Sequence, residues 1–218
     1  MFLRYVTRSA TAVAAVGAMG IVSEFKQGKC VNCESPPAAF QALRPKVPTH
    51  TRIDNSAEAK KSGEVLMKAS KRGRNVIHHT LKGEGMIEAY EIYVNENREE
   101  MVAVVQIGKD MCGYPGAVHG GVSAALIDNT AGWHYLVLAE KKPGVTAYLN
   151  LNYRSVVKAG TPVVITQKLR EVKGRKYYID ITMTDEHGKV LVEAEALFVQ
   201  LKPTWTNYIG NLLVQLGF

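Results

Sequence analysis

A histidine and two glycines, His119-Gly120-Gly121, open the segment HGGVSAALIDNTAGWHYLVLAE and constrain the fold of this chain more than any other feature. The apolar segment that follows predicts a helix from His119 to about Ala139, roughly 30 Å long at 1.5 Å per residue. Asp128 lies seven residues after Gly121, so both residues share one helix face. Small residues crowd the first half of this helix, which predicts that a curved sheet approaches it closely.

Runs of β-branched and aromatic residues on both sides of this helix predict strands. Two runs precede it and are separated by the polar turn NENREE, as expected for a hairpin. Four runs follow it, and the turns between the last three contain Gly174 and Gly188. The predicted strands are 86–94, 101–108, 145–154, 161–172, 176–184 and 190–201. This order predicts an α+β fold, a largely antiparallel sheet wrapped around a long central helix.

The two ends of the chain lie outside this pattern. Residues 1–56 lack sustained periodicity and contain four prolines, so they are predicted to be an N-terminal extension and linker before a folded domain at 57–202. Residues 57–73 predict a surface helix. Residues 203–218 place six apolar side chains on one helical stripe, namely Trp205, Tyr208, Ile209, Leu212, Leu213 and Leu216. This amphipathic C-terminal helix is predicted either to close the core or to dock on a membrane surface or another subunit.

The first 22 residues combine arginines and hydroxylated side chains, with no acid before Glu24, which is typical of a mitochondrial transit sequence. Their apolar run, residues 10–22, is shorter than the roughly 20 residues that span a bilayer as a helix. A small-residue helix that packs on a partner is the competing interpretation.

Charge and cysteine content narrow the classes of function. The 218 residues include 27 Lys and Arg against 20 Asp and Glu, a formal charge of +7, which favours an anionic partner. Aromatic and basic residues do not interleave as in a base-stacking surface, so nucleic-acid binding is not expected. Cys30 and Cys33 form a CxxC without a second ligand pair, and the other candidates, Cys112, His78 and His79, are scattered. No metal site is therefore expected.

From Met86 to Pro203 the chain resembles the hotdog-fold thioesterases of the HGG type, and within them the mitochondrial acyl-CoA thioesterases called thioesterase superfamily members 4 and 5. Five blocks carry the resemblance in the family's order and spacing: GYPGAVHGG (113–121), ALIDNT (125–130), TAYLNLNY (146–153), VKGRKYY (172–178) and EALFVQLKP (195–203). The resemblance implies a hotdog fold and hydrolysis of fatty acyl-CoA to free acid and coenzyme A. It also implies no cofactor beyond the coenzyme A of the substrate, and a mitochondrial location in the matrix or at the inner membrane.

The helix entrance suits thioester chemistry, because a thioester carbonyl under attack becomes an oxyanion that fixed donors stabilise. The first N–H groups of a helix lack intrahelical partners, so Gly121 can donate one, and the absent side chains of Gly120 and Gly121 let the substrate approach. The resemblance gives the Gly121 amide the same role. Asp128 is then the candidate nucleophile or general base.

The spacing of these groups favours a dimer. Seven residues separate Asp128 from Gly121 by roughly 10 Å along the helix axis, which is too far for both to serve one carbonyl. Antiparallel helices from two subunits would bring the Asp128 of one protomer to the Gly121 of the other. We therefore expect a homodimer or heterodimer with composite sites.

The resemblance assigns further residues. It gives Thr146 a hydrogen bond to the catalytic acid or its water. His119 is expected to be a structural or orienting residue rather than a base, because a helix entrance offers its imidazole backbone partners. Many relatives carry an Asn or Gln shortly before the HGG, where this chain has Cys112-Gly113-Tyr114. The expected contacts to the nucleotide of coenzyme A are Asn152, Arg154, Arg175 and Lys176.

Two other functions compete with hydrolysis. A hotdog dimer with these long ends would also suit a structural subunit of a mitochondrial membrane complex, with residues 1–56 and 203–218 as docking arms. A hotdog hydratase or dehydratase would need a histidine and an acid facing an enoyl chain, which the HGG arrangement fits poorly.

Overall fold

The structure, a computed structural model, describes residues 38–44, 50–52, 76–140 and 142–202. These residues belong to one compact unit that begins at Ser35. The predicted N-terminal and surface helices, the CxxC at Cys30 and Cys33, and the amphipathic helix at 203–218 lie outside the described residues. Within the described part of the chain, no helix is both long enough and apolar enough to cross a membrane.

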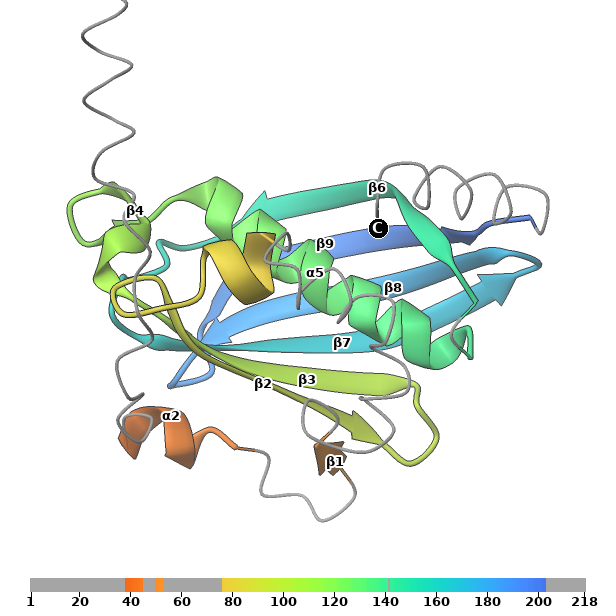
Figure 1. Cartoon of the computed structure of the whole chain (residues 1–218), viewed down its shortest axis with the longest axis horizontal. Helices are drawn as coiled ribbons and strands as arrows, with labels where there is room; N and C mark the ends of the chain where they lie inside the picture. Colours follow the sequence, from red (N-terminus) through yellow and green to blue (C-terminus); the bar gives the residue numbers. More distant parts are fainter. Residues whose placement is uncertain (1–37, 45–49, 53–75, 141, 203–218) are drawn as a thin grey trace, which may run out of the picture. The chain divides into compact units, whose positions relative to one another are not determined.

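A seven-stranded antiparallel sheet forms the framework, in the order β1-β2-β3-β7-β8-β9-β6 (Figure 1). Its strands are β1 (His50–Arg52), β2 (Ile87–Asn95), β3 (Glu100–Ile107), β6 (Gly144–Tyr153), β7 (Pro162–Lys173), β8 (Lys176–Asp185) and β9 (Val190–Gln200). The six strands predicted from the sequence are confirmed. Their hydrophobic alternation and glycine turns were sufficient signals.

The helix α5 (Gly120–Leu138) lies across one face of the sheet (Figure 1). It buries side chains such as Leu126 and Tyr135 against Ile165, Ile179 and Phe198 of the sheet. The predicted α+β architecture, an antiparallel sheet around a long helix, is therefore confirmed.

The small residues of α5 were predicted to let the sheet approach closely, and this explanation holds only in part. A Cβ built at Gly132 would meet Phe198 no closer than 3.9 Å, an ordinary contact, so the sheet does not require glycine there. At Gly120 and Gly121 the nearest neighbours are instead the side chains of Tyr153 and His119. The tight contacts therefore lie at the mouth of the helix.

The other face of the sheet is partly covered by α2 (Ala38–Ala42). Phe40 is fully buried against Tyr93 and Val104. Arg44 makes two hydrogen bonds, of 2.9 and 2.8 Å, to the carboxylate of Glu91. With β1 paired to β2, this part of the segment predicted as a linker packs on the sheet instead.

Short elements precede the strands and the helix. The π-helical turn η1 (Val76–Thr80) lies before β2, and η2 (Lys109–Met111) follows β3. A two-stranded sheet, β4 (Cys112–Tyr114) with β5 (Ala117–Val118), leads directly into α5. These elements were not predicted, because each is shorter than the window over which periodicity can be recognised.

Candidate active site

An irregularity in β6 decides which of its side chains face α5. Thr146 pairs with Phe198 of β9 but Tyr148 pairs with Leu197, so Ala147 is an extra residue, a β-bulge. In a regular strand Thr146 and Tyr148 would point to the same face. The bulge instead directs Thr146 toward the helix and Tyr148 to the opposite face.

The acid and the hydroxyl predicted as partners lie in contact. The Thr146 hydroxyl donates a hydrogen bond to Oδ1 of Asp128, with a distance of 2.9 Å. Asp128 is half-buried on the third turn of α5, while Thr146 is exposed near the start of β6. Within the described part of the chain Oδ2 of Asp128 has no hydrogen-bond partner, so it can accept a hydrogen bond from a water molecule.

The mouth of the helix carries a side-chain cap that the sequence spacing did not indicate. His119 is the N-cap residue, and its Nδ1 accepts a hydrogen bond of 3.0 Å from the Gly121 N–H. The Gly121 amide, expected to lack an intrahelical partner, thus has a side-chain acceptor outside the helix. Because Nδ1 accepts here, this tautomer carries its ring proton on Nε2. The imidazole of His119 therefore has a backbone partner at the helix entrance.

Tyr153 is a residue at the site that the sequence analysis did not assign. Its hydroxyl donates a hydrogen bond of 2.9 Å to the carbonyl oxygen of Gly120. Thr146 and Tyr153, near the two ends of β6, thus reach Asp128 and Gly120 on the same helix. The only signal in the sequence was the position of Tyr153 in the block TAYLNLNY.

The predicted nucleotide contacts fall into two groups. Arg154, at the end of β6, bonds Glu193 with a distance of 2.7 Å, and Asn152 nearby is exposed. Arg175 donates to the carbonyl of Gln200 at 2.8 Å, and Lys176 beside it is exposed.

Within one protomer the two groups lie far apart. Tyr153 pairs with Val192 of β9, whereas Lys176 pairs with Val199. Seven residues of strand separate those partners, about 23 Å at about 3.3 Å per residue. One protomer therefore does not bring the four predicted nucleotide residues together.

His78, one of the scattered metal candidates, lies in an aromatic pocket beside α5. Its Nε2 accepts a hydrogen bond of 3.1 Å from the Trp133 indole and lies 3.2 Å from Nδ2 of Asn129. Burial, and secondarily the charge of Lys82, lowers the pKa of His78. The neutral ring serves as an acceptor, and no group of metal-binding side chains occurs among the described residues.

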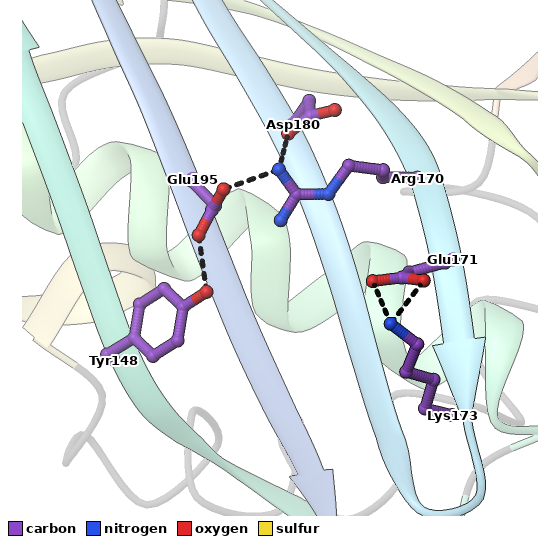
Figure 2. Close-up of polar contacts among 6 residues, drawn as sticks. All are labelled: Tyr148, Arg170, Glu171, Lys173, Asp180 and Glu195. Atoms are coloured by element: carbon purple, nitrogen blue, oxygen red, sulfur yellow. Dashed lines mark hydrogen bonds and ion pairs between the residues drawn. The ribbon is translucent and has the colours of Figure 1, made fainter.

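The face of the sheet turned away from α5 carries a charged network (Figure 2). Arg170 bonds Glu195 at 2.5 Å and Asp180 at 3.2 Å, and Tyr148 donates to Glu195. The hydrogen bond from Arg170, followed by that from Tyr148, lowers the pKa of Glu195. This network is separated from Asp128 by the sheet itself.

Comparisons with known proteins agree with this geometry. Residues 115–192 match the family model described as "Thioesterase superfamily". The chain is 30% identical over 171 residues to the rat "Acyl-coenzyme A thioesterase THEM4", covering 78% of this chain and 67% of that protein. A Candida albicans protein named "Uncharacterized protein, mitochondrial" is 25% identical over 127 residues, 56% of this chain and 57% of its own. The solved structure of the E. coli PaaI protein matches with a TM-score of 0.52 and 13% identity, over 67% of this chain and 96% of that one, which shows the fold.

The fold and these matches define a hotdog protein, and the chain belongs to the thioesterase superfamily. Within that superfamily its curated relatives include the acyl-coenzyme A thioesterases THEM4 and THEM5. The chain spans about half to two thirds of the length of the THEM4 relatives, from 49% to 67%.

Proposed function

We propose that the protein hydrolyses fatty acyl-CoA thioesters to free fatty acid and coenzyme A. The observation that carries this proposal is the hydrogen bond from Thr146 to Asp128, which holds the Asp128 carboxylate on the same helix that presents the Gly121 amide. The names of the relatives favour hydrolysis over the purely structural role that we considered as an alternative.

The chemistry needs few groups. As a general base, Asp128 takes a proton from water, whose oxygen bonds the carbonyl carbon, and that proton later passes to the departing thiolate or to solvent. As the nucleophile, the Asp128 carboxylate itself bonds the carbonyl carbon, and after the thiolate has left, water hydrolyses the acyl–Asp128 anhydride to free acid and regenerates the carboxylate. The Gly121 N–H stabilises the oxyanion that forms. The C–S bond then breaks, and coenzyme A leaves as a thiolate, which needs little help because a thiol has a pKa of about 8.5.

The site is completed by a second copy of the chain. Within the described sheet, β6 is an edge strand, and Val145 and Tyr153 on it are 48% and 53% exposed. Antiparallel pairing of two β6 edges would place the Thr146 end of one strand beside the Tyr153 end of the other. Asp128 of one protomer would then face the partner's Gly121, as the helix spacing requires.

The same pairing accounts for the separated nucleotide residues. Arg175 bonds the carbonyl of Gln200, which pairs with Gly144 at the start of β6. In an antiparallel dimer, the partner's Asn152 and Arg154 come to this end. The phosphates of coenzyme A would therefore be bound by Arg175 and Lys176 of one protomer together with Asn152 and Arg154 of the other.

We further propose that the protein acts in mitochondria, in the matrix or at the inner membrane. A Candida relative is named mitochondrial and a yeast relative is named "MIOREX complex component 3". The first 22 residues, with two arginines, several hydroxylated side chains and no acid, agree with this location. Residues 1–56 and 203–218 are the candidate contacts to a larger mitochondrial membrane complex.

Substitution of the acid tests the proposed activity. Asp128→Asn keeps the size and a hydrogen-bond acceptor but removes the charge, so kcat for palmitoyl-CoA should fall about 10²- to 10⁴-fold. Thr146→Val should lose part of the activity, whereas Thr146→Ser, which keeps the hydroxyl, should retain most of it. Equal turnover by wild type and Asp128→Asn would rule out this mechanism.

A further inference from the structure

Two side chains hold the peptide unit between Gly120 and Gly121, one at each end. The Gly120 carbonyl accepts the hydrogen bond from Tyr153, at 2.9 Å, and the Gly121 N–H donates to His119, at 3.0 Å. The peptide belongs to the first turn of α5, which sets its direction, and because carbonyl and N–H form one planar group, a contact at either end also acts on the other. This is the peptide whose N–H the proposed function assigns to the oxyanion.

The contact with Tyr153 joins distant parts of the chain. Tyr153 is 53% exposed, yet its hydroxyl bonds a backbone carbonyl 33 residues earlier. A Cβ at Gly120 would lie 3.4 Å from the phenol ring carbon Cζ and the hydroxyl oxygen, so the glycine leaves room for this approach. The bulge at Ala147 lies between Thr146 and Tyr153, and it is what lets both side chains face the helix.

We infer that Tyr153 is a positioning residue for hydrolysis, which orients and polarises the Gly120–Gly121 peptide toward the thioester oxygen. This inference rests on the proposed function. A hydrogen bond to a carbonyl strengthens donation by the N–H of the same peptide, because aligned hydrogen bonds polarise one another. His119 is the resident acceptor of that N–H until the thioester oxygen takes its place.

The strand offers a matched control. Tyr148 lies on β6 as well, and its hydroxyl also donates a hydrogen bond, to Glu195, but on the opposite face of the sheet (Figure 2). Tyr153→Phe and Tyr148→Phe therefore delete the same atom from the same strand. Only the first deletion touches the peptide at the mouth of the helix.

The test measures kcat and KM for palmitoyl-CoA in the full chain, together with the NMR shifts of the Gly120 carbonyl carbon and the Gly121 amide nitrogen. Tyr153→Phe should lower kcat about five- to tenfold, the value of one hydrogen bond, with KM nearly unchanged. Both shifts should move, whereas Tyr148→Phe should leave kcat and shifts as in wild type.

Three results would overturn the inference: a kcat of Tyr153→Phe equal to that of Tyr148→Phe, a loss confined to KM, or unchanged shifts of the peptide. These differ from failure of the proposed function, in which wild type and Asp128→Asn both lack turnover. In that case Tyr153 has no positioning role in hydrolysis, but the NMR shifts of the Gly120–Gly121 peptide still report whether its hydrogen bond to Tyr153 exists.

Discussion

Three histidines on or beside α5 differ in burial and in hydrogen-bonding role, because each ring has different surroundings. His119 is exposed and caps the helix, while His78 is half-buried and accepts from Trp133. His134 is fully buried, and its Nε2–H donates to the carbonyl of Arg98 at 2.9 Å. Burial is the main cause that lowers the pKa of His134 to about 4.

This buried histidine makes stability depend on pH. The unfolded chain protonates His134 near 6.5 and the folded chain near 4, so its contribution is complete above pH 6.5 and is lost as the pH falls to 4. The difference between these two pKa values corresponds to about 3 kcal/mol of unfolding free energy. Urea unfolding of wild type and His134→Gln across this range should show a shallower pH dependence in the variant. Equal slopes would contradict the assignment.

Among the elements, β6 shows most clearly what the sequence can and cannot predict. Its position and length follow from alternation and flanking turns, and Asp128 follows from helical spacing. Thr146 and Tyr153, however, are seven positions apart, so a regular strand would send them to opposite faces. No residue pattern marks the bulge at Ala147, so the contact of Tyr153 with the helix could not be predicted.

The caps and packed ends of elements were similarly beyond prediction. Spacing indicates that the Gly121 amide lacks an intrahelical partner, but not that the ring of His119 turns back to accept from it. Likewise Phe40 lies in a stretch too short for periodicity, and only the sheet surface formed by Tyr93 and Val104 gives it a place to be buried.

The start of β6 should be sensitive to a single methyl group. A Cβ at Gly144 would overlap the ring of Tyr135, which is buried, stacks on Phe198 at 5.2 Å and donates to the carbonyl of Lys142. Gly144→Ala should therefore destabilise the protein by about 1–3 kcal/mol.

Gly132→Ala is the control for that substitution. Gly132 lies inside α5, and a Cβ there would make only ordinary contacts, with Phe198. The variant should therefore be more stable by about 0.5–1 kcal/mol, because alanine has the higher helix propensity. Chemical denaturation measures both changes, and a Gly144→Ala variant as stable as wild type would contradict the packing described for Tyr135.

For the whole molecule, the site residues are divided between the two ends of one edge strand, β6. Asp128 with Thr146 and the Gly120–Gly121 peptide with Tyr153 lie toward opposite ends of β6 in one protomer. In the proposed dimer, two-fold symmetric pairing of β6 edges would give two identical sites, each with an acid from one chain and an amide from the other. Each protomer alone would supply two half-sites that belong to different active centres.

Mixed dimers distinguish this arrangement from sites within one protomer. Asp128→Asn removes the acid, and Gly121→Val obstructs the amide with a side chain whose Cβ already meets the His119 ring at 3.1 Å. Each homodimer should be inactive. A heterodimer purified through two different tags would contain one site with both defects and one with neither, because the intact Asp128 and the intact Gly121 come from different chains. Its activity should be about half that of wild type, as symmetry requires. Sites contained within single protomers would leave the heterodimer as inactive as its parents, provided that circular dichroism shows both variants to be folded.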